Sequence, residues 1–218
     1  MIISIDGPAG SGKSTVADIL AAKLGFVHFN SGSLYRAITA YALINKLDID
    51  ENITLLSTLP LEVQFINSYQ HVFVKGVDYT SYLRNNEVST HCSYVSKFKS
   101  IRNLVDNCQR NFANNNNVVI EGRDIGSFVF PNAEYKFYLD CSVDVRAKRR
   151  FDEEKAKGSS ITFEEIRQQI IERDKFDINK PIAPLVVPKG AFVIDSTTKT
   201  AEQVAEEMFN IIKQNSKV

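Results

Sequence analysis

The first fifteen residues contain glycines, a lysine and a serine at spacings that suit phosphate binding. The run from Gly7 to Ser14, GPAGSGKS, fits the pattern G-x-x-x-x-G-K-[ST]. Glycines at positions 7, 10 and 12 permit positive φ angles, so consecutive backbone N–H groups can point at phosphate oxygens. Lys13 would supply a charge for the β- and γ-phosphates and Ser14 a hydroxyl for Mg²⁺, which indicates nucleoside triphosphate chemistry.

The segments on both sides of this loop support the same interpretation. Ile2, Ile3 and Ile5 predict a buried strand before it, and STVADILAAKLG predicts a helix after it. The alternative is a glycine turn that only packs a helix on a strand. The Lys-Ser ending and both flanking elements favour a phosphate-binding loop over that alternative.

Several arginines lie in predicted loops or near predicted helix starts, where a second phosphate could bind. They are Arg36, Arg102, Arg123, Arg146, Arg149, Arg150 and Arg173. Phosphoryl transfer needs such groups because the transferring group carries spread negative charge, and an arginine can bind a phosphate through two N–H donors.

Two parts of this arginine set have different interpretations. Arg123 and Asp124 directly follow the predicted strand VVIEG, at the edge where α/β sheets bind ligands, so we expect both in the site. For Arg146, Arg149 and Arg150 taken alone, a solvated charged helix face with i,i+4 pairing is favoured.

The composition limits the classes of function. The chain has 218 residues, with 26 Lys and Arg against 26 Asp and Glu, so no net charge would attract nucleic acid or an anionic membrane. Cys92, Cys108 and Cys141 form no C-x-x-C pair, which favours free thiols over disulfides or a zinc site. There is no leader pattern and no run of 18 uncharged apolar residues. We expect a soluble cytoplasmic protein that binds neither nucleic acid nor membranes.

The order of the predicted elements indicates a parallel α/β sheet. IISI, VVIEG, YKFYLDC and AFVIDS predict strands buried on both faces, and helical patterns cover residues 16–24, 33–46, 98–113, 144–157, 162–173 and 200–214. From about Leu61 to Tyr82, apolar and polar residues alternate around an Asn-Ser turn, which predicts an inserted antiparallel β unit. This unit could be a mobile flap over the site or a plain surface hairpin.

Taken together, these motifs resemble bacterial cytidylate kinases, a family of P-loop nucleoside monophosphate kinases. The matching stretches are IDGPAGSGKST, NSGSLYRA, EVSTHCSYVSKFKSIR, EGRDIGSFVFPNAEYKFYLDCS, RDKFDINKPIAPL and VIDSTT, in family order over nearly the whole chain. The resemblance implies a single domain with a P-loop kinase core at 1–38, 98–145 and 175–218. It also implies a monophosphate-binding β insertion at about 39–97 and a helical lid at about 146–174.

The resemblance implies a role for each matched residue. The implied ATP-binding residues are Gly7, Pro8, Ala9, Gly10, Ser11, Gly12, Lys13, Ser14 and Thr15. The implied CMP-binding residues are Ser31, Arg36, Ser93, Arg102, Arg123, Asp124, Arg173, Asp177 and Lys180. The implied catalytic residues are Lys13, Arg36, Arg123, Arg149 and Arg173, with Mg²⁺ on Ser14 and otherwise held mainly by water and ATP.

Within the acceptor site, the resemblance divides the residues by the part of CMP that they would meet. Arg36 and Arg123 would hold its phosphate. Ser31, Arg102 and Asp124 would face cytosine, and Ser93, Arg173 and Asp177 would lie near the pentose. Cytosine presents an amino donor beside two acceptors, which a carboxylate and an arginine can read, so we expect UMP to be a much poorer acceptor.

Four positions depart from the family pattern. Lys180 stands where arginine is usual, Phe176 replaces a polar residue, Glu121 stands where Asp is commoner, and Asn30 precedes the Ser-Gly pair in place of Asp. An ammonium group lacks the planar fork of a guanidinium, so Lys180 bears on base discrimination.

The implied reaction is transfer of the γ-phosphate of ATP to CMP or dCMP by a monomeric enzyme of pyrimidine nucleotide metabolism. It needs no general base, because a nucleotide phosphate is already ionised near neutral pH, so His28, His71 and His91 are interpreted as structural or surface residues. Two alternatives stay open. One is a P-loop kinase for another small acceptor such as shikimate or gluconate, and the other is an ATP-binding switch that transfers no phosphate.

Overall fold

The computed structural model describes residues 1–215. They form two compact units. The first unit contains Met1–Phe26 and the chain from Val119 onward, and the second contains Val27–Val118.

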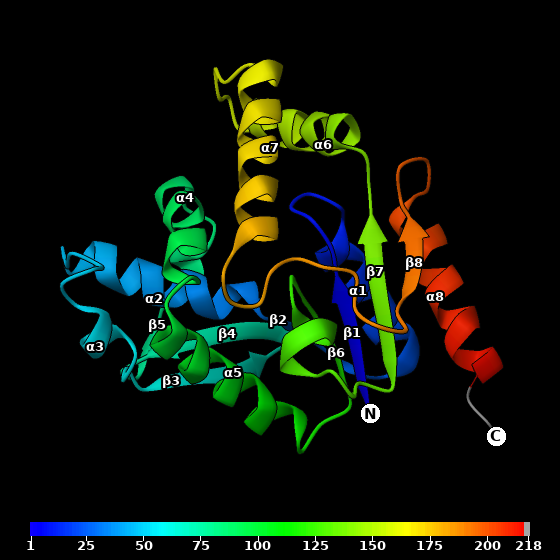
Figure 1. Ribbon diagram of the computed structural model, residues 1–218, viewed down its shortest axis with the longest axis horizontal. Helices are drawn as coiled ribbons and strands as arrows, with labels where there is room; N and C mark the ends of the chain where they lie inside the picture. Colours follow the sequence, from blue (N-terminus) through cyan, green and yellow to red (C-terminus); the bar gives the residue numbers. More distant parts are fainter. Residues whose placement is uncertain (216–218) are drawn as a thin grey trace. The chain divides into compact units, whose positions relative to one another are not determined.

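The first unit is built on parallel strands, as the alternation of strands and helices predicts. β1 (Ile2–Asp6) pairs in parallel with β7 (Tyr135–Asp140), placing Ile5 opposite Phe137. β7 pairs in parallel with β8 (Phe192–Asp195), and β6 (Val118–Gly122) is the other neighbour of β1 (Figure 1). The predicted parallel α/β fold is therefore confirmed.

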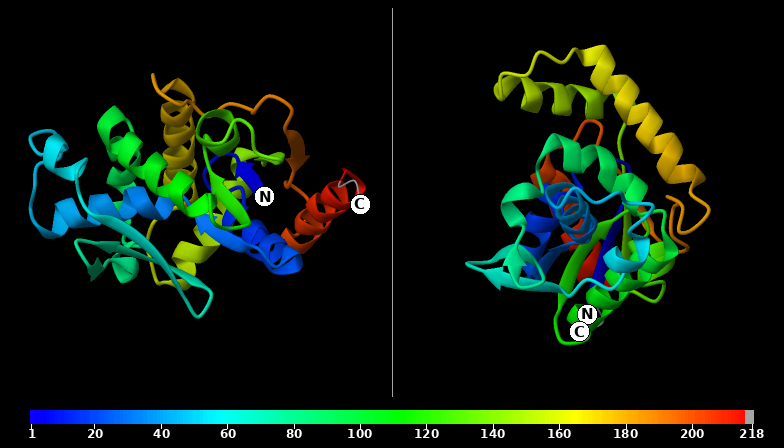
Figure 2. Two further views of the ribbon diagram at one scale, coloured as in Figure 1. Left: turned by 90° about the horizontal axis from the view of Figure 1, so that it is seen from below. Right: turned by 90° about the vertical axis from the view of Figure 1, so that its left-hand side faces the viewer.

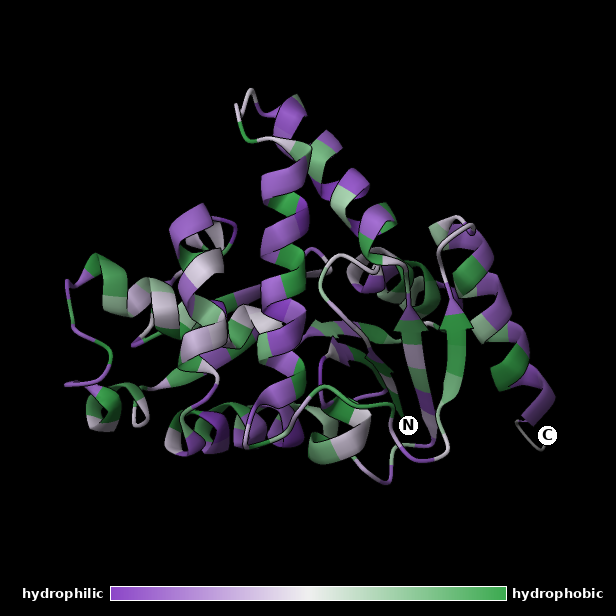
Figure 3. Ribbon diagram, turned by 45° about the horizontal axis from the view of Figure 1, so that its top comes forward, coloured by the Kyte–Doolittle hydropathy of each residue, from purple (hydrophilic) through white to green (hydrophobic). Residues whose placement is uncertain are grey.

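Two helices cover this sheet with apolar side chains. α1 (Lys13–Leu24) and α8 (Ala201–Asn215) pack against each other and contribute Leu20 and Met208 to a core with Ile3 and Phe137, all fully buried. Figure 3 shows the hydrophobic colour along the strands that these helices cover. Each such side chain contributes about 1.5–3 kcal/mol when removed from water, so this core fixes the strand that precedes the phosphate loop.

β8 differs from its prediction. The sequence predicts burial on both faces, but Phe192 is 39% exposed and Val193 is 57% exposed. The prediction is wrong for this strand because β8 is the last strand of the sheet and pairs only with β7. An apolar run alone does not distinguish an edge strand from a central one.

The α6–α7 arm, residues 143–179, contains two helices with their own small core. α6 (Val143–Ala156) begins after Ser142, whose hydroxyl accepts from the backbone of Val145. α7 (Phe163–Asn179) begins with a capping box between Thr162 and Glu165, and continues past the predicted end at residue 173. Ala147, Ile166 and Ile170 are buried between the two helices, while most of α7 is hydrophilic (Figure 3).

The second unit contains the predicted antiparallel insertion. β3 (Leu61–Ile66) pairs with β4 (Tyr69–Val74), and a short β5 (Val77–Asp78) completes the sheet (Figure 2). Asn67 and Ser68 have φ angles of 51° and 68°, as the two central residues of a tight hairpin turn require. The predicted turn is therefore confirmed.

Helices make up most of the rest of the second unit. Its remaining elements are β2 (Val27–Asn30), α2 (Gly32–Ile44), α3 (Ile53–Leu56), η1 (Thr80–Tyr82), α4 (Asn86–Val95) and α5 (Lys99–Ala113). α2 packs against α4 and β4. The sequence interpretation missed β2, α3 and α4, because these segments are short or mainly polar and lack a clear apolar period. Within residues 1–215, no helix has the length and hydrophobicity to span a membrane.

Candidate active site

The phosphate loop has the backbone conformation that its sequence predicts. It joins the end of β1 to the start of α1, and Gly7, Gly10 and Gly12 have φ angles of 152°, 77° and 90°. Gly12 is the residue just before α1, so its left-handed conformation turns the chain into the helix. The N-terminal N–H groups of α1 therefore point toward the loop, which favours an anion there.

Lys13 bonds to its own loop. Its ammonium donates to the carbonyl oxygen of Pro8 at 2.6 Å and to the hydroxyl of Ser11 at 3.2 Å. Burial and the nearby Arg123 guanidinium hold the pKa of Lys13 well below its usual value, although Glu121 and Asp6 oppose this shift. An anionic ligand in the loop would favour the protonated ammonium, so phosphate binding and the charge on Lys13 support each other.

Ser14 bonds to an acidic residue on the neighbouring strand. Its hydroxyl donates to the carboxylate of Glu121, which is 5% exposed near the carboxyl end of β6. In the sequence, Glu121 stands out only as a departure from the family pattern. Its place at the carboxyl end of a predicted strand is the sequence feature that could have identified Glu121 as a site residue, because α/β sheets bind ligands at this edge.

Arg123 is paired with a buried carboxylate. Its Nε atom donates to Asp177 at 3.1 Å, and the ammonium of Lys180 lies 3.7 Å from the other oxygen of Asp177. Burial by itself would raise the pKa of Asp177, but Arg123, Lys180 and Arg173 outweigh it, so the pKa is lowered. Asp177 is therefore ionised at neutral pH. Four predicted CMP-binding residues form one charged group: Arg123, Arg173, Asp177 and Lys180.

Asp124 begins a turn that the sequence did not predict. The turn, η2 (Ile125–Val129), is π-helical, and the carbonyl oxygen of Asp124 accepts from the backbone of Phe128 and Val129. Asp124 is 6% exposed. Short π-helical turns are frequent at functional sites and have no simple sequence pattern.

Arg146 is the clearest correction to the sequence interpretation, which favoured a solvated face. This residue is only 3% exposed. Its guanidinium donates to the carbonyl oxygens of Cys141 at 2.9 Å and Ala9 at 3.0 Å, and to the carboxylate of Asp174 at 2.6 Å. Arg146 therefore ties α6 to both the phosphate loop and α7.

Two other predicted arginines belong to the same arm. The guanidinium of Arg149 donates to the carbonyl oxygen of Ser196 at 2.9 Å, and its Nη1 atom lies 3.6 Å from the position that a Cβ on Gly12 would take. Arg173 lies close enough to lower the pKa of Lys13. The first unit thus brings Lys13, Arg123, Arg149 and Arg173 to the phosphate loop.

Arg36 belongs to the second unit and is held by neutral oxygens. It lies on α2, half-buried, and its Nη1 atom donates to the hydroxyl of Ser89 at 2.7 Å and to the carbonyl oxygen of Leu83 at 3.1 Å. These contacts orient the guanidinium without neutralising its charge.

The other predicted residues of the second unit lie on the same group of helices. Ser31 is buried at the start of α2, and Ser93 lies on α4. Arg102 on α5 is 2% exposed, with its guanidinium carbon 5.8 Å from the centre of the Tyr35 ring and Nη1 3.4 Å from the carbonyl oxygen of Ser96. A charge buried this deeply is costly, which favours a role beyond packing.

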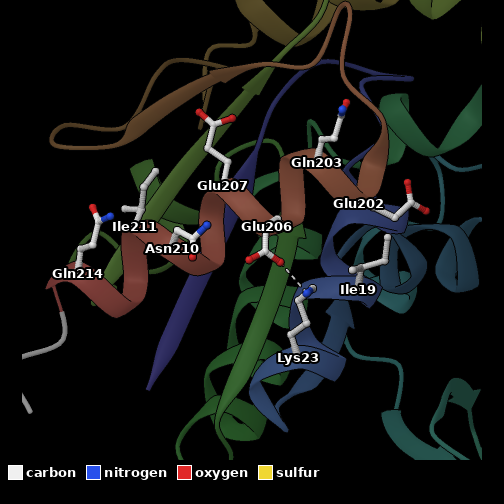
Figure 4. Close-up of a pocket in the computed structure, with 9 residues that line it drawn as sticks. All are labelled: Ile19, Lys23, Glu202, Gln203, Glu206, Glu207, Asn210, Ile211 and Gln214. Atoms are coloured by element: carbon white, nitrogen blue, oxygen red, sulfur yellow. Dashed lines mark hydrogen bonds and ion pairs between the residues drawn. The ribbon is translucent and has the colours of Figure 1, made fainter.

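A separate groove of about 790 Å³ lies between α1 and α8. Figure 4 shows its nine lining residues, including the ion pair of Lys23 and Glu206 at 2.7 Å. None of the nine is a predicted site residue. This groove is therefore not the site of the predicted phosphate chemistry.

Comparison with protein families and curated proteins gives one consistent match. A family model described as cytidylate kinase matches residues 3–214. The cytidylate kinase of Bacillus subtilis is 38% identical over 218 residues, covering 99% of this chain and 97% of the relative. The cytidylate kinase of Geobacillus sp. is 40% identical over 215 residues, covering 97% and 96%. That of Caldanaerobacter subterraneus subsp. tengcongensis is 38% identical, covering 99% and 96%.

Solved structures share the fold at low sequence identity. Shikimate kinase from Acinetobacter baumannii, solved with shikimate, has a TM-score of 0.52 at 16% identity and covers 100% of this chain and 95% of its own. Shikimate kinase from Bacteroides thetaiotaomicron has a TM-score of 0.53 at 14% identity and covers 98% of each chain. At this level of identity the likeness concerns the fold alone.

Proposed function

Because the chain belongs to the cytidylate kinase family, we propose that it transfers the γ-phosphate of ATP to CMP or dCMP, giving ADP and CDP or dCDP. The observation that carries this proposal is that two basic side chains from different loops lie close together. Lys13 comes from the phosphate loop, and Arg123, which lowers its pKa, comes from the turn after β6. The phosphate loop alone can bind the phosphates of one nucleotide. Transfer to a second nucleotide brings another phosphate close to the first, and a second cationic group beside the loop would stabilise the added negative charge.

The donor side uses the phosphate loop. Residues Gly7 to Thr15 would bind the phosphates of ATP through backbone N–H groups, while the Lys13 ammonium would leave Pro8 and Ser11 for the β- and γ-phosphates. Arg149, next to Gly12, would add charge at the γ-phosphate. These groups stabilise spread negative charge, which is the main task in this reaction.

The acceptor side uses the two arginines with the clearest positioning contacts. Arg36 and Arg123 would bind the CMP phosphate and align its oxygen with the γ-phosphorus. A nucleotide phosphate is already ionised at neutral pH, so the transfer is direct and needs no general base.

The nucleoside would be recognised by the buried polar residues. Asp124, Arg102 and Ser31 would face cytosine, and Ser93, Arg173 and Asp177 the pentose, with Lys180 beside Asp177. A carboxylate that accepts from the cytosine amino group would face a carbonyl oxygen in uracil, which disfavours UMP.

The residues present fit a Mg²⁺ ion, which supplies charge neutralisation on the donor phosphates when it is bound. Ser14 offers a hydroxyl and Glu121 a carboxylate, the oxygen ligands that Mg²⁺ prefers. Among the described residues no group of three or more His, Cys, Asp or Glu side chains is arranged so that it could hold a metal ion, so water and ATP would complete the coordination. Ser14 would be the direct protein ligand.

Residues 146–174 of the α6–α7 arm would act as the lid over the donor site. Its closure would exclude water, so that phosphate passes to CMP and not to water. We further infer a monomeric cytoplasmic enzyme that acts on small nucleotides and has no nucleic acid partner.

A coupled ADP-release assay with CMP, dCMP, UMP, AMP and shikimate tests the function. We expect rapid ATP turnover with CMP and dCMP, at least tenfold lower kcat/KM with UMP, and none above background with AMP or shikimate. Equal kcat/KM for CMP and UMP would contradict the base assignment. ATP turnover that does not depend on any acceptor would favour the switch alternative, and turnover with shikimate would favour the other kinase.

A further inference from the structure

Asp6 joins the phosphate-loop strand to the turn after β6. It is the last residue of β1 and is fully buried. Its two carboxylate oxygens accept from the backbone N–H groups of Ile125 at 2.8 Å and Gly126 at 2.7 Å. Two bonds from one carboxylate fix both the position and the direction of the start of η2.

The packing around Gly126 shows how closely this turn approaches β1. A Cβ atom at Gly126 would stand 2.6 Å from the hydroxyl oxygen of Ser4 and 3.1 Å from Cγ of Lys136. Only a glycine allows the turn to come this near the strand. The two hydrogen bonds of Asp6 therefore depend on the close approach of Gly126 to Ser4. A larger residue at position 126 would move the turn away from β1.

The turn that Asp6 holds begins with two proposed CMP-binding residues. Arg123 and Asp124 immediately precede Ile125 in the chain. A shift of the start of η2 would move both side chains relative to the phosphate loop. Misplacement of a binding group by about 1 Å can cost two orders of magnitude in rate.

This arrangement has an electrostatic cost. Burial, with a further contribution from Asp124, raises the pKa of Asp6 to about 7, although the backbone bonds of Gly126 and Ile125 and the charge of Lys13 oppose the shift. Tyr138 on β7 is a further titratable group within range of Asp6. The buried carboxylate of Asp6 therefore costs stability that an apolar side chain at this position would not cost. Residues that reduce stability in this way are expected at functional sites.

We propose that Asp6 is a positioning residue for the acceptor, holding the turn that presents Arg123 and Asp124 beside the phosphate loop. The proposal rests on the proposed CMP-binding role of these two residues. Asp6 acts through them and does not touch a substrate.

A double-mutant cycle with Asp6→Asn and Arg123→Met tests this role. An asparagine keeps the size of Asp6, but its amide nitrogen cannot accept from Gly126. We expect D6N to lower kcat/KM for CMP about thirtyfold, mainly through the KM for CMP, with the KM for ATP changed less than about threefold. In the R123M background, D6N should cost clearly less than thirtyfold, because one of the two groups that Asp6 positions is already gone and only Asp124 is still displaced.

Ser4→Ala is the matched control on the same strand. The Ser4 hydroxyl is buried without a hydrogen-bond partner among residues 1–215, so S4A should keep wild-type kinetics. The proposal is overturned if D6N stays within about threefold of wild type, or if it costs the same thirtyfold with and without Arg123.

Gly126→Ala disturbs the contact between Asp6 and the turn and leaves the carboxylate of Asp6 in place. This variant tests the proposal if D6N does not fold. We expect G126A to raise the KM for CMP about tenfold, and S4A in the same chain to restore part of it by removing the nearest clashing atom. Wild-type CMP affinity in a folded G126A variant would overturn the proposal. Failure of the proposed function is a separate result, because wild type and S4A would then also fail to phosphorylate CMP.

Discussion

Arg36 and Arg123 carry the same charge, yet the two units hold them with different chemistry. In the second unit Arg36 donates to two neutral oxygens, those of Ser89 and Leu83. In the first unit Arg123 donates to the ionised carboxylate of Asp177. Neutral partners orient a guanidinium and leave its charge for a ligand, whereas a carboxylate partner offsets that charge until a second anion arrives.

Because of this difference, substitution of the two arginines should leave different groups without a partner. Loss of Arg36 would leave only a hydroxyl and a carbonyl oxygen without one donor. Loss of Arg123 would leave the buried carboxylate of Asp177 with less compensating charge, near the phosphate that Arg123 is proposed to bind. The first change removes an attraction, and the second also adds a repulsion.

The largest effect is expected for Arg123→Met. We expect kcat/KM for CMP to fall about a hundredfold or more, because a charge-assisted contact of roughly 1.5–3 kcal/mol is lost and Asp177 is exposed to the phosphate. The KM for ATP, measured in the same coupled assay, should change far less. A variant within about threefold of wild type would contradict the assignment.

Asp177→Asn in the R123M background isolates the repulsion. If the uncompensated carboxylate contributes to the loss, the double variant should recover about tenfold of the kcat/KM that R123M loses. A double variant that is as impaired as R123M would show that Asp177 adds no repulsion, and the comparison between the two arginines would then fail.

Arg36→Met should have the second-largest effect. We expect about a thirtyfold decrease in kcat/KM for CMP, because one charge-assisted contact is lost and no carboxylate is left behind. Circular dichroism would check that the variant folds. An effect larger than that of R123M would reverse the order that the contacts predict.

Ser89→Ala should have a smaller effect on the same side. The variant removes the 2.7 Å hydrogen bond that orients Arg36 but leaves its charge, so the KM for CMP should rise about two- to fivefold. Thr90→Ala is the control, because the exposed Thr90 hydroxyl donates to the carbonyl oxygen of Asn86 within its own helix, α4, and does not hydrogen-bond to Arg36. Equal effects of the two variants on the KM for CMP would show that Ser89 does not orient Arg36 for CMP binding.

The smallest effect is a difference in acid sensitivity. The pKa of Asp177 is lowered below its ordinary value of 3.8, so its pairing stabilises the native state above that pH and the contribution is lost as the pH falls through the lowered value. The free-energy difference of unfolding between wild type and D177N should be constant from pH 7 to pH 5 and shrink below pH 4. Urea unfolding at each pH measures it, and a difference that grows in acid would contradict the sign.

Local patterns explain which parts of the site were predictable. GPAGSGKS places all of its binding groups within one short stretch, so the loop conformation follows from the sequence. The Asn-Ser turn between β3 and β4 is local in the same way, and both predictions are confirmed.

The contacts that were missed join residues far apart in the chain. Arg146 was interpreted through neighbours on its own helix, but its partners Ala9 and Asp174 lie 137 and 28 positions away. Asp6 and Gly126 are 120 positions apart, and Ser14 and Glu121 are 107 apart. A single sequence shows which residues carry charge, and only the fold shows which charges meet.

The most direct test of the account is a crystal structure with CMP and a non-hydrolysable ATP analogue bound together. We expect the Arg123 guanidinium to lie about 3 Å from the oxygens of the CMP phosphate, which itself faces the γ-phosphate in the Gly7–Ser14 loop. A structure in which Arg123 contacts only Asp177 and points away from the acceptor phosphate would contradict it.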